Sequence, residues 1–267
     1  MNLTQLCQSL LVVALGMSSS LATAVINGRD AEHSSAEPSA PVVGLQMSEA
    51  QPDGSTRYYK GTAFLIGPNL LLTAGHNVAY IPDPSNIEAI FASVPCWGPN
   101  VCHERRIAAM KAVVHRLFRQ ISGGTEFDLA VVKLATTAPD DYRAIPIINK
   151  SISLGAVQLQ FFGFGTDREA SNTPLSAFRL RSVNLTTINP DYRLGSKQNF
   201  WIDQSRGGIC GGDSGGPAIV KSPSFEAIGI AIHTTYSDGV EHCLTKSAFT
   251  DLVFFREWIR RTVKQLQ

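Results

Sequence analysis

The fold is decided by Gly208-Ile209-Cys210-Gly211-Gly212-Asp213-Ser214-Gly215-Gly216-Pro217, where five glycines surround a single serine and a single aspartate. Glycine at this density favours neither helix nor strand, and it permits positive φ angles and the close approach of another chain segment. A serine hydroxyl becomes a useful nucleophile only when a base removes its proton and N–H donors receive the developing oxyanion. The backbone around Ser214 offers such donors, so the base must be sought elsewhere in the chain.

The bulk composition sets broad limits on the answer. The chain has 267 residues, of which 44% are hydrophobic, enough to bury the core of one large or two small domains. Its formal net charge of +1 gives no electrostatic reason to expect nucleic acid or an anionic membrane surface as a partner. No motif indicates a cofactor or a metal ion.

The first 24 residues have the pattern of a secretory signal peptide. The apolar run 10–15 is followed by small residues and by Ala22-Thr23-Ala24, an A-x-A cleavage site, although no Lys or Arg precedes the run. The run is shorter than the roughly 20 residues that span a bilayer, and no later segment is long and apolar enough to do so. A buried N-terminal helix is the alternative. We expect a protein secreted to the periplasm or the medium, with residues 25–267 as its mature chain.

The cysteine count fits an oxidising compartment. Removal of the signal would take Cys7 away and leave an even number. The four that remain are Cys96, Cys102, Cys210 and Cys243. The short separation of the first two favours a local disulfide, and the other two would then pair with each other. A zinc site that adds His103 to these cysteines is the alternative, but the spacing is not that of a zinc finger.

Short apolar runs separated by turn residues dominate the chain. They include residues 41–45, 61–66, 70–73, 130–134, 157–162, 180–187 and 227–232. This pattern is typical of an all-β sandwich or barrel, and the runs do not alternate with helices as a parallel α/β sheet would require. At the C-terminus, Leu252, Phe255, Ile259 and Leu266 recur at helical spacing. That helix is expected to pack on a barrel rather than lie on a membrane surface.

Two candidates for the base and its orienting group stand out. His76 follows the apolar run 70–73 and two small residues, although a lone histidine is more often structural than catalytic. Asp128 opens an apolar strand, where a carboxylate is costly to bury unless it is paired. It either caps that strand or holds a histidine in the correct tautomer and stabilises the imidazolium. The order His76, Asp128, Ser214 favours the catalytic interpretation.

Together these motifs resemble those of the trypsin/chymotrypsin family of serine proteases. The matching segments are Leu-Thr-Ala-Gly-His at 72–76, Asp-Leu-Ala-Val-Val-Lys-Leu at 128–134, Gly-Phe-Gly-Thr at 163–166 and Gly-Gly-Asp-Ser-Gly-Gly-Pro at 211–217. They follow the order of the family, with 52 residues from His76 to Asp128 and 86 from Asp128 to Ser214. The resemblance implies an all-β fold of two antiparallel six-stranded β-barrels, roughly residues 25–135 and 136–250, followed by a C-terminal helix at 251–265.

The same resemblance implies the site and its chemistry. His76, Asp128 and Ser214 would form the catalytic triad of a serine endopeptidase, with the active site in the cleft between the barrels. The N–H groups of Gly212 and Ser214 would receive the oxyanion. The partners would be protein or peptide substrates and protein inhibitors.

The segment Val25-Ile26-Asn27-Gly28 resembles the start of a mature protease of this family. In such enzymes the freed α-amine pairs with the aspartate before the nucleophile, so Val25 would pair with Asp213. Because Val25 directly follows the A-x-A site, cleavage on export would itself create the active N-terminus, with no separate zymogen peptide.

The chain departs from the trypsin pattern at a disulfide. Trypsin-like enzymes carry a cysteine directly after the catalytic histidine, and Asn77 stands there in this chain. We place the missing partner of that cysteine at Lys60. The disulfide pattern is closer to bacterial members of the family.

The specificity pocket departs from the trypsin pattern as well. Gly208 occupies the position of the aspartate that gives trypsin its preference for Arg and Lys, so cleavage after basic residues is not expected. Gly208, Ile209 and His233 are the candidate pocket residues. His233 could meet an acidic substrate residue, as in glutamate-specific relatives, or merely replace an aromatic side chain beside a pocket for apolar or small residues. Both interpretations stay open.

Two other functions are weaker. Residues 212–216 also satisfy G-x-S-x-G, but an α/β-hydrolase esterase needs the order Ser, acid, His and a helix after the serine. Here His76 and Asp128 come first and Pro217 follows. A non-catalytic binding protein on the same fold would usually have lost a triad residue, and this chain keeps all three.

Overall fold

The computed structural model describes residues 25–34, 39–99, 102–122, 124–150, 155–166, 178–188, 198–221, 224–237 and 240–267, with the side chains of 233–242 and 244 outside the description. The predicted signal peptide lies outside these ranges.

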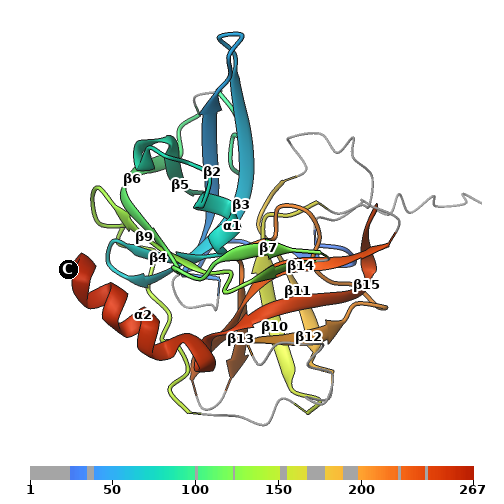
Figure 1. Cartoon of the computed structure of the whole chain (residues 1–267). Coiled ribbons are helices and arrows are strands. Elements are labelled where there is room, and N and C mark those ends of the chain that lie inside the picture. Colours follow the sequence, from blue (N-terminus) through green and yellow to red (C-terminus); the bar gives the residue numbers. More distant parts are fainter. Residues whose placement is uncertain are drawn as a thin grey trace, which may run out of the picture.

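The first half of the chain forms a closed antiparallel barrel in the order β2-β3-β4-β9-β6-β5. Its strands are β2 (Val42–Ala50), β3 (Thr56–Gly67), β4 (Leu70–Thr73), β5 (Ile87–Phe91), β6 (Arg105–Val114) and β9 (Ala130–Leu134). Short elements connect them: α1 (Gly75–Val78), the 3-10 turn η1 (Pro84–Asn86) and the ribbon of β7 (Arg119–Ile121) and β8 (Gly124–Glu126). Alternate apolar residues such as Leu45, Leu71 and Val132 fill the barrel interior. The β2–β3 hairpin projects well beyond the barrel (Figure 1).

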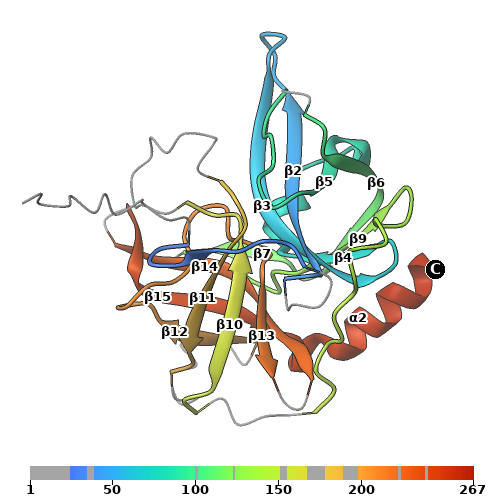
Figure 2. The same cartoon turned by 180° about the vertical axis from the view of Figure 1, so that it is seen from behind.

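The second half forms a seven-stranded antiparallel sheet in the order β1-β11-β10-β13-β14-β15-β12. Its strands are β1 (Arg29–Asp30), β10 (Gln158–Gly163), β11 (Arg181–Thr186), β12 (Asn199–Asp203), β13 (Pro217–Lys221), β14 (Phe225–Ser237) and β15 (Val240–Asp251). A bridge between Thr187 and Ile202 joins the end of β11 to β12, so the sheet curls toward a barrel around Phe161, Phe200 and Phe249. Figure 2 shows the two β halves side by side. The expected all-β architecture is confirmed.

The predicted C-terminal helix is confirmed as α2 (Leu252–Leu266). Asp251 caps it, because its carboxylate accepts a hydrogen bond from the Val253 N–H at 2.9 Å. The apolar stripe expected from the sequence is buried, and the Lys133 ammonium of β9 donates to the carbonyl oxygen of Leu266. The helix therefore packs against β9 of the barrel and β14 of the seven-stranded sheet. No helix in the described ranges is long and apolar enough to cross a membrane.

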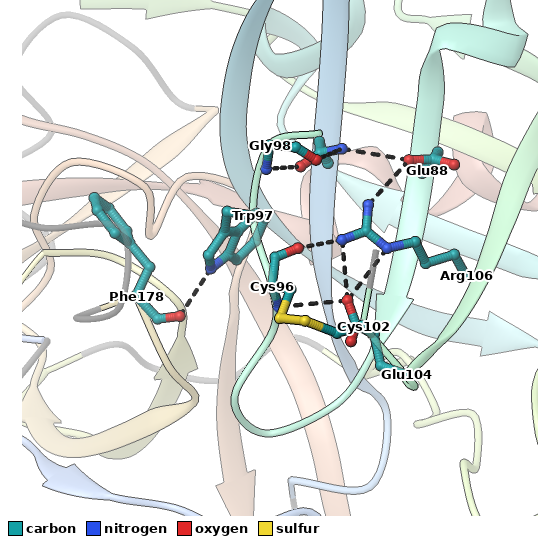
Figure 3. Close-up of polar contacts among 9 residues, drawn as sticks. Glu88, Cys96, Trp97, Gly98, Cys102, Glu104, Arg106 and Phe178 are labelled. Carbon is teal, nitrogen blue, oxygen red and sulfur yellow. Dashed lines mark hydrogen bonds and ion pairs between the residues drawn. A yellow bond between two sulfur atoms is a disulfide. The ribbon is translucent and has the colours of Figure 1, made fainter. Parts of the chain in front are cut away.

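A loop between β5 and β6 links the two halves (Figure 3). The Cys96–Cys102 disulfide closes this loop, and Arg106 holds it by donating to the Cys96 carbonyl and to Glu104. The buried Trp97 indole donates to the carbonyl oxygen of Phe178 at 2.8 Å, across the boundary between the halves. The loop thus anchors the first barrel to Phe178, whose ring lies beside Gly212 of the glycine-rich stretch.

Candidate active site

His76 and Asp128 form a buried pair. His76 is the second residue of α1, which follows strand β4. Asp128 lies two residues before β9, the strand that pairs with β4. One carboxylate oxygen of Asp128 accepts the His76 backbone N–H at 2.8 Å, and the other lies 2.7 Å from Nδ1. Asp128 is fully buried and the His76 side chain is 23% exposed. The ring is therefore fixed through Nδ1, with Nε2 left as its basic nitrogen.

Two threonines that sequence reasoning missed hold Asp128 in place. Thr125 donates a hydrogen bond from Oγ1 to the Asp128 carboxylate at 2.6 Å. Thr250, on β15 of the second half, donates to the Asp128 backbone oxygen at 2.9 Å. An aspartate before an apolar strand signals burial, but neither threonine belongs to a motif that would reveal its role.

The electrostatics of the pair favour an ionised aspartate. Burial raises the pKa of Asp128, but the charge of His76 and the hydrogen bonds from His76 and Thr125 outweigh burial and hold that pKa below 3.8. Burial lowers the pKa of His76, while the Asp128 charge and hydrogen bond raise it by more, so the pKa lies above 6.5. The imidazole can therefore accept a proton and hold it beside a carboxylate.

Ser214 lies in the same cleft as His76. Both residues line a cavity of about 500 Å³, together with Gly212. In this structure the Ser214 hydroxyl donates to the Ile232 carbonyl oxygen at 3.4 Å, and it makes no hydrogen bond to His76 among the described residues. Catalytic hydrogen bonds are often long before substrate binds, so the arrangement suits a nucleophile and its base.

Two backbone N–H groups at the nucleophile, those of Gly212 and Ser214, are available to donate hydrogen bonds. In the part of the chain that the structure describes, the amides of Gly212 and Ser214 have no acceptor, whereas those of Asp213 and Gly215 are engaged at 3.0 and 2.8 Å. Gly212 and Gly215 both have φ +94, which favours glycine. At Gly215 a Cβ would also overlap the Thr62 carbonyl oxygen. This backbone explains two of the glycines that mark the stretch in the sequence.

The first barrel fixes the carbonyls of the same loop. Thr62 donates from Oγ1 to the Gly212 carbonyl at 3.0 Å, and that hydroxyl accepts the Phe164 N–H, also at 3.0 Å. The Ser214 carbonyl accepts two hydrogen bonds of 2.9 Å, one from the Thr62 N–H and one from Asn77 Nδ2. The sequence motifs did not indicate this role of Thr62, and they identified Asn77 only as the residue in place of a cysteine.

The residue that faces Asn77 is Gly61 rather than Lys60. A Cβ built on Gly61 would lie 2.7 Å from Asn77 Nδ2, so Gly61 holds the position that we assigned to Lys60. Side chains alternate along β3, and Lys60 therefore points elsewhere, with its ammonium 3.3 Å from the centre of the Phe178 ring.

Asp213 is fully buried in the second half. Its carboxylate accepts the Gly165 N–H at 2.7 Å and the Cys210 N–H at 2.9 Å. A Cβ on Gly163 or Gly165 would overlap this carboxylate. The Gly-Phe-Gly motif therefore makes room for Asp213.

The segment that begins at Val25 docks beside the same loop. Val25 is fully buried, and the Ile26 carbonyl accepts the Gly208 N–H at 3.0 Å. Ile26 packs against the disulfide between Cys210 and Cys243. Val25 has φ 55, a conformation that β-branched residues rarely adopt.

The two expected disulfides, Cys96–Cys102 and Cys210–Cys243, are both present. Because these sulfur atoms are bonded to one another, they do not provide the thiolates that a zinc site with His103 would need.

Gly208 is packed against a buried glutamine. Gln204 donates from Nε2 to the carbonyl oxygens of Ile209 and Cys243, at 3.3 and 3.0 Å, and its Oε1 accepts the Ile209 N–H. A Cβ on Gly208 would overlap Gln204 Oε1. The Ile209 side chain is 2% exposed and packs in the core of the second half. His233 lies in β14, and its side chain is outside the described residues.

Comparison with known proteins indicates the same family that the sequence motifs resemble. The family model described as Trypsin matches residues 25–259. The chain is 23% identical over 232 residues to chymotrypsin-like elastase family member 1 of Homo sapiens, covering 82% of this chain and 86% of that protein. It is 25% identical over 212 residues to serine protease SSP1 of Scolopendra subspinipes, covering 75% of this chain and 72% of that protein.

Proposed function

The chain belongs to the trypsin family of serine endopeptidases, and we propose that it hydrolyses peptide bonds through an acyl-enzyme formed on Ser214. The observation that carries this proposal is the buried His76–Asp128 pair, whose histidine lines the same cleft as Ser214. An inactive binding protein gives no reason for this pair and the two unengaged amides, and a G-x-S-x-G esterase would need an α/β-hydrolase fold rather than the antiparallel sheets observed here.

The geometry suggests the following sequence of steps. Ser214 attacks the substrate carbonyl while His76 Nε2 takes the hydroxyl proton, and Asp128 stabilises the resulting imidazolium. The Gly212 and Ser214 amides donate to the oxyanion. His76 then gives its proton to the leaving amine, and the acyl group stays on Ser214 Oγ. Water, activated by His76 in the same way, releases the acyl product and restores the serine.

Activation would require a free α-amine at Val25, paired with Asp213. The docking of Ile26 on Gly208 already brings this segment to the loop that carries Asp213. The left-handed φ of Val25 is costly for a β-branched residue in an intact chain, and cleavage of the 24–25 bond would remove that constraint. We therefore propose secretion with cleavage before Val25. Mass spectrometry of the secreted protein should find Val25 at its N-terminus, and any other start contradicts this step.

The preferred residue on the acyl side is proposed to be neither Arg nor Lys. Gly208 offers no carboxylate, and the buried Gln204 amide occupies the space beside it. A small or apolar residue fits this arrangement, and the chain is similar to a protein named as an elastase. An acidic preference through His233 is the alternative, and cleavage profiling with a peptide library separates the two.

An active-site-directed phosphonate tests the function directly. The mature protein and a Ser55→Ala control, altered at the tip of the β2–β3 hairpin, should be labelled, and Ser214→Ala should not. Ser214→Ala should also lose roughly 10³-fold or more in peptidase activity while its circular dichroism stays unchanged. Equal labelling of all three proteins, or none, would favour the binding-protein alternative. Hydrolysis of esters without hydrolysis of peptides would favour an esterase.

A further inference from the structure

The residue before Asp128 has a strained backbone. Phe127 has φ 51, the left-handed region that residues with a β-carbon enter only at a cost. Glycine would adopt the same conformation freely. Strained residues persist only where their surroundings determine the conformation, and they gather at functional sites. A large aromatic side chain at this position therefore needs a compensating contact.

The backbone of Phe127 sets the direction in which Asp128 points. The Phe127 carbonyl accepts the Leu129 N–H at 3.0 Å, which closes a three-residue turn with Asp128 at its centre. The turn lies between β8 and β9. It brings one Asp128 carboxylate oxygen to 2.6 Å from the Thr125 hydroxyl, and the same oxygen lies 2.7 Å from His76 Nδ1. A change in φ at Phe127 would therefore rotate Asp128 relative to both partners.

Two rings contact the Phe127 ring, and a third ring packs behind them. The His115 ring stacks on Phe127 with 5.1 Å between the ring centroids and 11° between the planes. The buried Phe255 ring stands nearly perpendicular to Phe127 at 6.1 Å. Phe255 and Trp258 also pack against His115, at 5.4 and 5.1 Å. Ring pairs at these distances attract each other beyond the effect of the area they bury, so this aromatic cluster compensates the strain at Phe127.

The aromatic cluster joins the turn to distant parts of the fold. His115 directly follows β6 of the first barrel, whereas Phe255 and Trp258 belong to α2. Figures 1 and 2 show α2 alongside β9, the strand that the turn leads into. On its other side, the Phe127 N–H donates to Gln198 Oε1 at 3.2 Å, just before β12 of the second half. The conformation of Phe127 is thus fixed through its ring and through its backbone.

We propose that Phe127 is a positioning residue of the catalytic triad: the aromatic cluster holds its left-handed backbone, and that backbone aims the Asp128 carboxylate at His76. The inference rests on the proposed function, because it concerns the same triad. Phe127 and His115 act through Asp128 and not on the substrate, since neither is among the described residues that line the cleft.

The test separates the ring of Phe127 from its backbone. Phe127→Ala removes the ring and keeps a β-carbon, whereas Phe127→Asn also removes the ring but introduces a residue that enters the left-handed region readily. Tyr142→Ala is the matched control, because the Tyr142 ring also stacks on a histidine, His33, at 3.6 Å, and lies outside the cleft and the aromatic cluster. The measurements are kcat and KM for a peptide substrate, thermal unfolding, and the NMR resonance of the His76 Nδ1–H, which reports its hydrogen bond to Asp128.

We expect Phe127→Ala to lower kcat by about tenfold, the scale of a small misplacement of a catalytic group, with little change in KM. The loss should stay well below the roughly 10⁴-fold loss in kcat that follows when the aspartate no longer fixes the tautomer of the histidine, because the carboxylate is still present. Phe127→Asn should recover most of kcat and the His76 resonance of the unaltered protein, although it loses the same ring contacts. Tyr142→Ala should lower the midpoint of unfolding and leave kcat and the resonance unchanged.

A second pair of variants applies if Phe127→Ala does not fold. His115→Ala removes the stacked ring and leaves Phe127 itself unaltered, and it should lower kcat. His115→Phe should keep kcat because it retains an uncharged ring. His115 is itself uncharged at neutral pH, since burial and the charge of Arg116 hold its pKa below 6.5.

Two results overturn the inference. One is an unchanged kcat and an unchanged His76 resonance in both Phe127→Ala and His115→Ala. The other is an equal loss of kcat in Phe127→Ala and Phe127→Asn, which would show that the ring contributes by packing alone. If the unaltered protein cleaves no peptide and the phosphonate does not label Ser214, the proposed function fails, and the His76 resonance of the variants still shows whether Phe127 orients Asp128.

Discussion

Replacing Thr62 with valine should show what the two hydrogen bonds of the Thr62 hydroxyl contribute, because valine removes them and nearly keeps the shape of the side chain. The Thr62 hydroxyl both donates to the Gly212 carbonyl and accepts the Phe164 N–H. Valine keeps nearly the same shape and removes both hydrogen bonds. The Phe164 N–H is buried and would lose its acceptor, at a cost of about 1–3 kcal/mol in the free energy of unfolding. The free energy of unfolding of a typical domain is about 5–15 kcal/mol, so Thr62→Val should still fold.

The effect on catalysis should exceed what lost stability explains. Removing an oxyanion donor outright costs about 10²–10³ in kcat. Thr62→Val keeps both proposed donors and frees only the carbonyl of Gly212, so we expect a smaller loss of about tenfold in kcat, equivalent to about 1.4 kcal/mol. KM should change little, because Thr62 is not among the residues that line the cleft. Thr62 would then be a positioning residue.

Steady-state kinetics and thermal unfolding of three variants check this reasoning. Thr62→Ser keeps the hydroxyl and should recover most of kcat. Thr187→Val is the matched control, since the buried Thr187 hydroxyl also accepts a backbone N–H, that of Val157 at 2.9 Å, without contacting the glycine-rich loop. It should lose stability and keep its kcat. If Thr62→Val lowers the midpoint of unfolding but leaves kcat intact, the positioning role is refuted.

Three further predictions concern the triad and the pocket. The pH profile of kcat/KM should rise with a midpoint above 6.5, because His76 must lose its proton to act as a base and its pKa is raised. Asp128→Asn removes the negative charge that raises the His76 pKa, while burial, which lowers that pKa, remains. NMR titration of this variant should therefore find the His76 pKa below 6.5. An unchanged pKa would contradict the pairing of His76 with Asp128. Gly208→Asp should destabilise the protein, because its Cβ would overlap Gln204, and should not create cleavage after Arg or Lys in a library digest.

Local signals predicted the all-β class, the C-terminal helix and the need of Asp128 for a partner, whereas the two-barrel arrangement and the cleft were implied by the resemblance to the family. Alternating apolar runs predict strands wherever one face is buried, and the helical stripe that ends at Leu266 predicts α2. Asp128 is recognisable because a carboxylate at the start of a buried strand needs a partner. Such signals can be read within a window of a few residues.

The supports of the glycine-rich loop could not be predicted in this way. The hydrogen bond from Thr62 to Gly212 joins residues 150 positions apart, and it forms only because the two halves meet there. Threonine is common in strands, so its presence at Thr62 indicates strand propensity and nothing more. The role of Gly165 likewise depends on Asp213, which packs into the space that a Cβ would fill.

The register of β3 shows how one residue changes the chemistry of the cleft. Successive side chains of a strand point to opposite faces, so an error of one position exchanges the two faces. With Lys60 placed opposite Asn77, its charge would be assigned to the site of a lost disulfide. With Gly61 there, Asn77 has room to donate to the Ser214 carbonyl, and the Lys60 ammonium lies against the Phe178 ring on the opposite face of β3. A glycine and an asparagine in place of the disulfide therefore provide a hydrogen bond that holds the backbone of the nucleophile.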